Sequence, residues 1–172
     1  MDKKVYILDA SSIIGGFYSK EYINIMPSSA VSEIKDINSK MLLEQIIASG
    51  NLIIEDIIGS DEELKISLKS SGDYMRLSDT DRDIIRLALK YTRDNYNVLV
   101  VTDDYSMQNT LKILKIPFRS IITKGINSIV KWQRICKGCK KEYDPEYPED
   151  DCEICGSTII TKRVKNKRQG NI

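Results

Sequence analysis

The sequence predicts an α/β domain with a mostly parallel sheet, followed by a small unit built on four cysteines. Short apolar runs alternate with segments whose apolar residues recur at helical spacing, the pattern of a sheet covered by helices. All four cysteines lie between positions 136 and 155, beyond the last of these runs. The chain of 172 residues is long enough for one domain with its own core and an appendage too small to fold unaided.

The first elements follow from apolar spacing and from cap residues. Val5–Leu8 is a short apolar run of the kind found in buried parallel strands. Residues 11–18 are expected to form a turn and a short helix. Ser28 and Ser29 can cap a helix whose apolar residues continue at helical spacing until Gly50 ends it. We therefore expect a strand, a short helix and one longer helix in this part of the chain.

The clearest helix of the chain begins at Ser78. Ser78 and Asp81 have the spacing of a capping box, and a stripe of apolar residues follows them. The remaining elements are strands at 52–54, Val98–Val101 and 118–122 and helices at 60–71 and 107–114. Three parts are thus expected: an α/β domain over 1–126, a cysteine unit over 127–161 and a basic tail over 162–172.

Composition excludes several classes of function. The chain has no histidine, which rules out Ser-His-Asp triads and metal sites that need imidazole. No apolar run reaches the roughly 18 residues of a membrane-spanning helix, and the N-terminus lacks the features of a secretory leader. We therefore expect a cytoplasmic protein without membrane contact. The basic tail suits contacts with RNA phosphates, and a solvated terminus is the alternative.

Four cysteines form the most specific metal-binding pattern in the sequence. Cys136, Cys139, Cys152 and Cys155 have the spacing C-x2-C-x12-C-x2-C, which places four thiolates tetrahedrally around Zn²⁺. Disulfides are disfavoured in a reducing compartment, and the βαβ context of a redox CxxC is absent. An iron–sulfur cluster could use the same ligands. We expect a structural zinc ion that supplies much of the folding free energy of a zinc ribbon.

Acidic residues lie where the predicted strands end and helices begin. Asp9 follows the first strand, Asp103 and Asp104 follow Val98–Val101, and Glu33 and Asp81 lie in the first turns of their helices. In open α/β sheets, ligands bind beyond the carboxyl ends of the strands, so these carboxylates are expected to converge. Like charges held close together need a cation, and oxygen ligands suit Mg²⁺ or Mn²⁺.

Each of these acids also has a purely local interpretation. Asp81 could be the partner of Ser78 in the capping box, and Asp103 or Asp104 could cap the next helix. Glu33 could be one charge on an exposed helix face. Asp9 has the weakest local alternative, because a buried strand ends in aspartate mainly at turns or sites. The joint placement of the acids is what favours a functional site.

Four segments resemble, in order and spacing, the acidic motifs of PIN-domain nucleases. They are VYILDASS, SSAVSEI, LSDTDRDIIRLA and VVTDDYSMQN. Together with the four-cysteine ribbon they are similar to the Nob-one family, endonucleases that cleave precursor small-subunit rRNA at its mature 3′ end. The resemblance implies a PIN-like three-layer α/β/α sandwich. It also implies catalytic roles for Asp9, Glu33 and Asp81 with one of Asp103 and Asp104, and the T-x-D pattern favours Asp104.

The resemblance further implies a Mg²⁺- or Mn²⁺-dependent endoribonuclease of archaeal type that acts in ribosome biogenesis. Its partner would be precursor 16S rRNA or the pre-ribosomal small subunit, and a homodimer is left open. One or two ions held by Asp9, Glu33, Asp81 and Asp104 would activate a water, with Ser11 and Thr102 positioning the acids. Two alternatives stay open: a toxin-type PIN ribonuclease acting on tRNA or mRNA, and a non-catalytic RNA-binding assembly factor.

Overall fold

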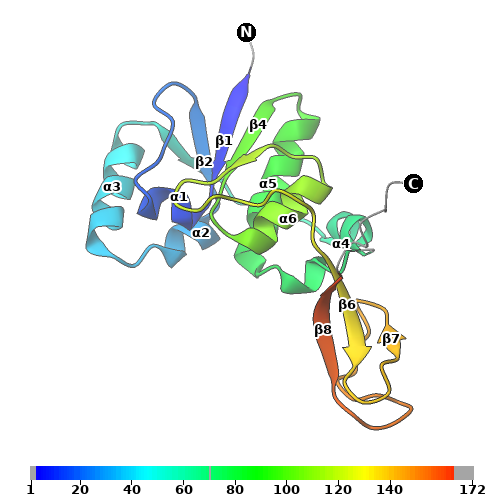
Figure 1. Cartoon of the computed structure of the whole chain (residues 1–172). Coiled ribbons are helices and arrows are strands. Elements are labelled where there is room, and N and C mark those ends of the chain that lie inside the picture. Colours follow the sequence, from blue (N-terminus) through cyan, green and yellow to red (C-terminus); the bar gives the residue numbers. More distant parts are fainter. Residues whose placement is uncertain (1–2, 70, 165–172) are drawn as a thin grey trace, which may run out of the picture.

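The computed structural model describes residues 3–69 and 71–164, which form an α/β unit and a smaller antiparallel unit beside it (Figure 1). The strands of the larger sheet are β1 (Lys4–Leu8), β2 (Ile23–Met26), β3 (Leu52–Ile54), β4 (Asn97–Val101) and β5 (Phe118–Arg119). They are all parallel and lie in the order β3-β2-β1-β4-β5. The predicted α/β class with a parallel sheet is therefore confirmed.

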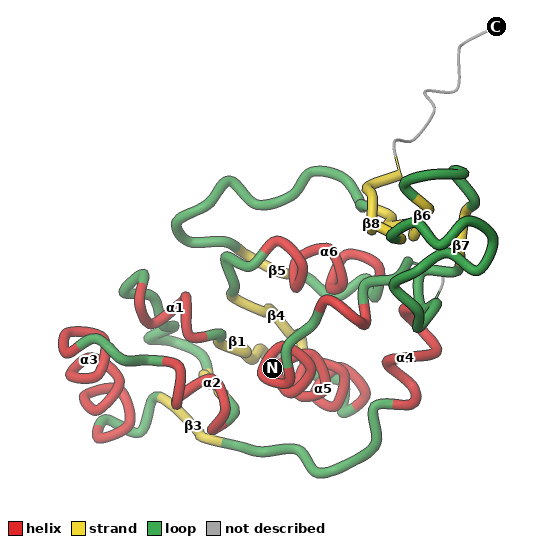
Figure 2. Tube along the Cα trace, turned by 90° about the horizontal axis from the view of Figure 1, so that it is seen from below, coloured by secondary structure: helices red, strands yellow, loops and turns green. Residues whose placement is uncertain are grey.

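Helices cover both faces of this sheet. The helices are α1 (Ala10–Ile14), α2 (Ser28–Glu33), α3 (Ile37–Ala48), α4 (Glu62–Leu68), α5 (Asp79–Arg93) and α6 (Tyr105–Ile113), with a 3₁₀ turn η1 at Tyr74–Arg76. Figure 2 shows α1 and α3 on one side of the sheet and α5 and α6 on the other. The central strands β1, β2 and β4 are consequently mostly buried, as the apolar runs of β1 and β4 require, whereas the edge strands β3 and β5 are partly exposed.

The strand β2 was not predicted from the sequence. Its middle residue, Asn24, is polar but fully buried, and it interrupts the apolar pattern of the segment. The Asn24 amide donates to the carbonyls of Ser19 and Asn51, and its oxygen accepts from the Ser19 amide at 2.8 Å. The nitrogen and the oxygen of the side-chain amide are thus both hydrogen-bonded, which removes most of the cost of burying it.

The single helix expected from Ser28 to Gly50 is wrong, because the chain forms two helices there. Ile34 is extended, and Asp36 begins α3 by accepting from the Ser39 amide at 2.9 Å. Ser28 does not act as a cap; its amide and hydroxyl both donate to Asp56 instead. Glu33 is therefore the last residue of α2, a helix of fewer than two turns. The strand expected at 118–122 is likewise shorter, ending at Arg119.

The smaller unit is a three-stranded antiparallel sheet of β6 (Lys131–Cys136), β7 (Glu142–Tyr143) and β8 (Ile159–Val164), in the order β7-β6-β8. We call it the ribbon. Its small core consists of two cysteines, Tyr143 and Ile159. The predicted basic tail begins within β8, and its residues 165–172 lie outside the described part of the chain. Within that described part, no helix is both long and apolar enough to cross a membrane.

Candidate active site and cysteine cluster

The strand order of the sheet reverses between β1 and β4. These strands are neighbours, but the chain leaves β1 towards β2 on one side and leaves β4 towards β5 on the other. Such a reversal of strand order separates the connections and is where ligands of open α/β sheets bind. Asp9 directly follows β1, and Thr102, Asp103 and Asp104 directly follow β4.

Asp9 is the most buried carboxylate of the site, with 8% of its surface exposed. Its Oδ1 accepts from the Ala10 amide at 2.6 Å, and its Oδ2 accepts from the hydroxyls of Ser11 at 2.8 Å and Thr102 at 2.9 Å. Burial raises the pKa of Asp9 above its ordinary value, although these hydrogen bonds act in the opposite direction. The side chain is therefore held in one orientation by donors that follow β1 and β4.

The two hydroxyls that hold Asp9 also hold the chain after β4. Thr102 Oγ1 accepts from the Asp104 amide at 3.1 Å, and Ser11 Oγ accepts from the Asp103 amide at 3.1 Å. Ser11 and Thr102 therefore link the carboxyl ends of β1 and β4 in two places. The positioning role expected for them has direct contacts to support it.

Asp103 and Asp104 occupy different environments although they are adjacent. The Asp103 carboxylate accepts from three successive amides, those of residues 121–123, and from the Thr123 hydroxyl at 3.0 Å. Burial opposes it, but these hydrogen bonds hold the pKa of Asp103 below its ordinary value. Asp104 caps α6 through Oδ1, which accepts from the Met107 amide at 2.7 Å. Asp103 thus anchors a loop, whereas Asp104 is exposed to solvent.

Asp81 serves both as a cap and as part of the acidic site. The capping box is present, because Asp81 Oδ2 accepts from the Ser78 amide at 2.8 Å and the Ser78 hydroxyl accepts from the Asp81 amide. Burial raises the pKa of Asp81, and the charges of Asp104 and Asp9 raise it further. The local interpretation is confirmed, and it leaves the functional one open, since the same side chain lies near both other acids.

Glu33 reaches the site from the end of α2. It is exposed, and it lies close enough for its charge to raise the pKa of Asp9. A hydrogen bond of 2.8 Å from the Ser29 hydroxyl to Asp83 joins α2 to α5, which also carries Asp81. The structure thus brings Asp9, Glu33, Asp81 and Asp104 to one edge of the sheet and directs the carboxylate of Asp103 into a loop.

The donor set of these four acids fits a hydrated hard cation. Among the described residues, no hydrogen bond reaches Asp104 Oδ2, Asp81 Oδ1 or the Glu33 carboxylate, so these oxygens are available as ligands. In the same part of the chain, only the four cysteines bring three or more ligand atoms within 4.8 Å of one another. The wider spacing of the acids leaves room for the waters that Mg²⁺ retains when carboxylates bind it.

The four cysteines form a compact cluster in the ribbon. Their Sγ atoms all lie within 4.8 Å of one another, and the Cys136–Cys155 and Cys139–Cys152 pairs are 3.4 and 3.5 Å apart. These separations are far longer than a disulfide bond of about 2.05 Å, and all four thiols are free. A hydrogen bond of 3.0 Å from the Tyr143 hydroxyl lowers the pKa of Cys152, which favours the thiolate form that zinc binds.

Gly138 is required by close packing in the first cysteine knuckle. A Cβ atom at this position would lie 2.5 Å from Ser157 Oγ and 3.2 Å from Cys155 Sγ. A side chain at position 138 would therefore displace Ser157 or Cys155. The cluster suits Zn²⁺ in its number of ligands, their chemistry and their arrangement.

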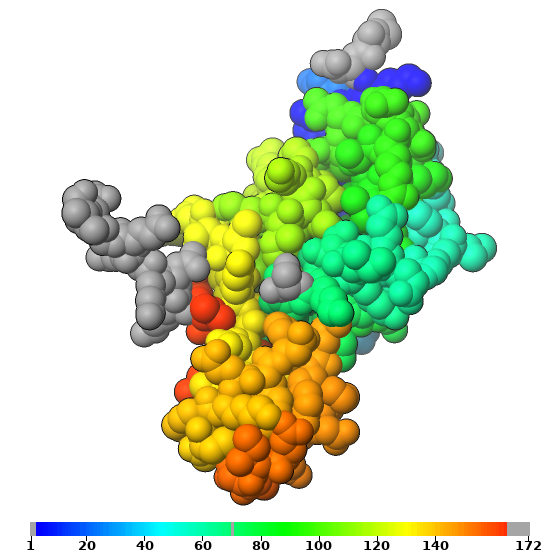
Figure 3. Space-filling view, turned by 90° about the vertical axis from the view of Figure 1, so that its right-hand side faces the viewer, coloured from blue at the N-terminus to red at the C-terminus, as the bar shows by residue number. Residues whose placement is uncertain are grey.

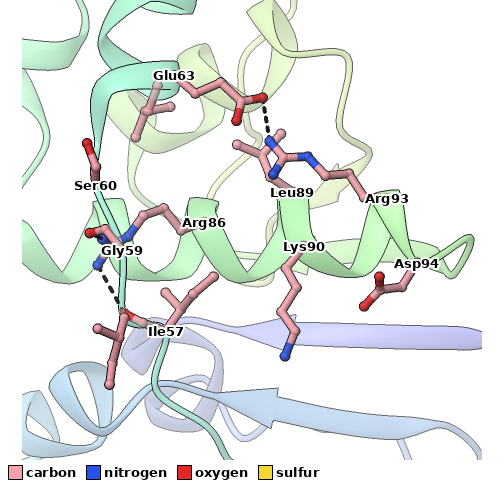
Figure 4. Close-up of a pocket in the computed structure, with 11 residues that line it drawn as sticks. Ile57, Gly59, Ser60, Glu63, Arg86, Leu89, Lys90, Arg93 and Asp94 are labelled. Carbon is pink, nitrogen blue, oxygen red and sulfur yellow. Dashed lines mark hydrogen bonds and ion pairs between the residues drawn. The ribbon is translucent and has the colours of Figure 1, made fainter.

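A separate pocket of about 380 Å³ lies between α5 and residues 57–64 (Figure 4). Arg86 donates to the Gly59 carbonyl at 2.8 Å across it, and Arg93 pairs with Glu63. None of the five candidate acids lines this pocket. Its charged groups join α5 to α4 and to the loop before α4, and we assign them a structural role.

Several known proteins are similar to this chain, whereas no family model matches it. Endoribonuclease Nob1 of Methanothermobacter thermautotrophicus is 43% identical over 163 residues, covering 93% of this chain and 94% of that protein. Endoribonuclease Nob1 of Methanocaldococcus jannaschii is 38% identical over 95% of this chain and 80% of its own length. Ribonuclease VapC1 of Thermoplasma acidophilum is 33% identical over 98% of this chain and 82% of its own length. These matches include both the α/β unit and the ribbon.

Proposed function

Because the chain belongs to the Nob1 endoribonuclease family, we propose that it cleaves precursor 16S rRNA to produce the mature 3′ end of the small-subunit rRNA. The family resemblance expected from the acidic motifs and the cysteines is thereby confirmed. The observation that carries the proposed chemistry is the convergence of four carboxylates, Asp9, Glu33, Asp81 and Asp104, at the carboxyl ends of β1 and β4.

The arrangement supports metal-assisted hydrolysis of a phosphodiester bond. A bound Mg²⁺ or Mn²⁺ ion would supply an activated water and neutralise the charge that develops on the phosphate. Asp9 is fixed by Ser11 and Thr102 and is the most central ligand. Asp81 and Asp104 approach from α5 and from the end of β4, and Glu33 completes the set from α2. Water rather than the 2′-hydroxyl attacks, so the products carry a 5′-phosphate and a 3′-hydroxyl.

Asp104 is proposed as the ligand from the adjacent pair, and Asp103 as a structural residue. Asp103 already accepts four hydrogen bonds from residues 121–123. Asp104 keeps one oxygen available beside Asp81. We further propose zinc at the four cysteines and a cytoplasmic location. The ribbon would complete an RNA-binding surface on the α/β unit.

The substrate assignment is tested by mapping the cut. The full chain, loaded with zinc, is incubated with Mn²⁺ and a transcript that spans the 3′ end of the small-subunit rRNA and its trailer. One cut at the mature end, with a 5′-phosphate on the trailer fragment, supports the proposal. Equal cutting of an unrelated RNA contradicts it.

A second candidate is a ribonuclease that acts on other RNAs, such as tRNA or mRNA. The similarity to ribonuclease VapC1 over 98% of the chain favours it. The same digestion, repeated with tRNA and with a messenger transcript, separates the two candidates. Preferential cutting of either RNA over the rRNA precursor supports the second one.

A further inference from the structure

A row of three adjoining hollows follows the junction between the α/β unit and the ribbon. Trp132, the only tryptophan of the chain, lines all three of them. The first, of about 460 Å³, is lined by Tyr105, Trp132 and Arg163 among others, and the second adds Arg76. The third continues onto the ribbon as far as Tyr147. We call this row the junction groove; Figure 3 shows the ribbon, in orange, projecting from the α/β unit at this junction.

One end of the junction groove lies beside the candidate active site. Tyr105 is the first residue of α6 and directly follows Asp104. Its side chain is 54% exposed and lines two of the hollows. A nucleic-acid strand with one phosphate at the candidate active site would therefore pass over Tyr105 into the junction groove. It would not have to cross the sheet.

The groove combines aromatic rings with unpaired cations. The Arg76 guanidinium lies 3.9 Å from the centre of the Trp132 ring, a cation–π contact. Arg163 lies directly opposite Trp132 in the antiparallel pairing of β8 with β6. Both arginines are exposed, and neither is paired with an acid among the described residues. Aromatic rings beside cations are the chemistry that binds single-stranded nucleic acid, because bases stack on the rings and phosphates bind the cations.

The acidic residues of the ribbon do not oppose this use of the groove. Seven acids lie between positions 142 and 153, and of these only Glu146 lines a hollow, the one farthest from the active site. Arg134, which lines the same hollow, pairs with Asp150 at 2.7 Å. The first two hollows contain no acidic side chain.

The two walls of the groove are fixed relative to each other. The buried Asn109 amide on α6 donates to Asp73 and to the Val130 carbonyl at 2.8 Å, and its oxygen accepts from the Val130 amide at 2.7 Å. The Trp132 amide donates to the Ser71 carbonyl at 3.2 Å. Figure 2 shows the connection from β5 passing along α6 before it enters β6. The distance from the acids to Trp132 is thus set by the fold.

We propose that the junction groove binds the single-stranded RNA that flanks the cleaved bond, with one base stacked on Trp132 beside Tyr105 and phosphates bound by Arg76 and Arg163. This inference rests on the proposed function, because the bound strand is the substrate of the acidic site. Because the junction is rigid, the distance between Trp132 and Asp9 is fixed. A base held at Trp132 therefore determines which phosphate reaches Asp9. The ribbon contributes to the choice of the cleaved bond as well as to affinity.

The test uses the full zinc-loaded chain carrying Asp9→Asn and a fluorescent RNA that spans the precursor 3′ end. Tyr105→Ala and Trp132→Leu are each expected to weaken binding about 5- to 150-fold, the range found when an aromatic ring that stacks on a base is removed. Trp132→Phe retains a ring and should restore most of the affinity. Arg163→Ala should lower the slope of log Kd against log salt by about one. Zinc content and thermal unfolding show that each variant is folded.

Matched controls replace the same residue types away from the groove. Tyr22→Ala removes an exposed ring that directly precedes β2, at the amino ends of the strands, and Arg93→Ala removes an exposed arginine whose surface pair with Glu63 contributes little. Neither should change Kd more than about twofold if stacking in the groove dominates. Weakening by the controls equal to that by the groove variants overturns the proposal, as does unchanged binding by all groove variants.

Cleavage by the chain with Asp9 intact separates this proposal from the proposed function. In that background Tyr105→Ala and Trp132→Leu should spread the single cut over neighbouring bonds. An intact chain that cuts no RNA refutes the nuclease assignment. An intact chain that cuts at one bond, with the position and rate unchanged by both substitutions, refutes the groove alone.

Discussion

The Thr102 hydroxyl donates to Asp9 Oδ2 at 2.9 Å, although 93 residues separate the two in the sequence. The contact joins the carboxyl ends of β1 and β4, and the same hydroxyl accepts from the Asp104 amide. One side chain therefore positions two of the proposed ligands. The geometry of the acidic site depends on this buried pair as much as on the acids themselves.

Thr102→Val is predicted to lower cleavage at least about tenfold, because Asp9 loses a donor that fixes its orientation. The hydrogen bond lowers the pKa of Asp9, so its loss raises that pKa further, and activity on the acidic side of the pH–rate profile should fall at a higher pH. The profile of kcat/KM against pH measures this. Thr110→Val is the matched control, since the buried Thr110 hydroxyl has no partner among the described residues.

The two adjacent acids after β4 are predicted to have different roles, Asp104 in catalysis and Asp103 in stability. Asp104→Asn keeps a good helix cap and should lose cleavage about 100-fold or more while unfolding near the wild-type temperature. Asp103→Asn should retain cleavage within about tenfold and lose roughly 1–3 kcal/mol of stability, because a neutral amide oxygen replaces the charged carboxylate that accepts from the loop amides. The reverse pattern, with Asp103 essential for cleavage and Asp104 dispensable, would reassign the ligand.

The stabilising effect of Asp103 is predicted to depend on pH. Its pKa is lowered in the folded chain, so the carboxylate contributes stability above its unfolded value of about 3.9 and loses it as the pH falls through the folded value. The difference in unfolding free energy between wild type and Asp103→Asn should therefore be constant near neutrality and shrink in acid. Urea unfolding at several pH values measures it.

Asp81→Asn is predicted to stabilise the chain when no Mg²⁺ or Mn²⁺ is present. The pKa of Asp81 is raised in the folded state, so its ionised form costs stability at neutral pH, and this cost fades as the pH falls. The asparagine keeps the capping oxygen and removes the charge. Thermal unfolding should also show a smaller stabilisation by added Mn²⁺. Asp79→Asn, at a side chain that is 96% exposed in the same helical turn, should do neither.

Gly138→Ala is predicted to weaken zinc binding, because the new Cβ would overlap the Ser157 hydroxyl. Release of zinc to a colorimetric chelator should be faster than from wild type. A second change, Ser157→Gly, removes the obstructing side chain and should restore most of the retention. Gly59→Ala is the control, since nothing lies within 4 Å of a Cβ there. Equal rates of zinc release from wild type and Gly138→Ala would remove the steric role assigned to Gly138.

The sequence predicted the α/β class, the cysteine cluster and the capping box because each depends on residues close together in the chain. Asp9 could be singled out because a charged residue directly after a buried strand is found mainly at turns or functional sites. The strand β2 was missed because the contacts that satisfy Asn24 come from residues 19 and 51, which no local pattern reveals. The break before Asp36 was missed for a similar reason, since helical spacing continues across it.

The division of roles between Asp103 and Asp104 could not be read from their positions. It follows from the loop at 121–123, whose amides reach back to Asp103 across the end of the sheet. The junction groove was also missed, because Arg76, Tyr105 and Trp132 belong to three separate segments. A lone tryptophan beside Lys131 was the only local signal for it.

The most direct test of the account is RNA cleavage by the wild-type chain and by Asp9→Asn, with Asp79→Asn as the control for loss of an acid. The substrate spans the 3′ end of the small-subunit rRNA, and reactions are run with and without Mn²⁺. We predict a single Mn²⁺-dependent cut at the mature end by wild type and by Asp79→Asn, and none by folded, zinc-loaded Asp9→Asn. Undiminished cleavage by Asp9→Asn would contradict the placement of the active site between β1 and β4.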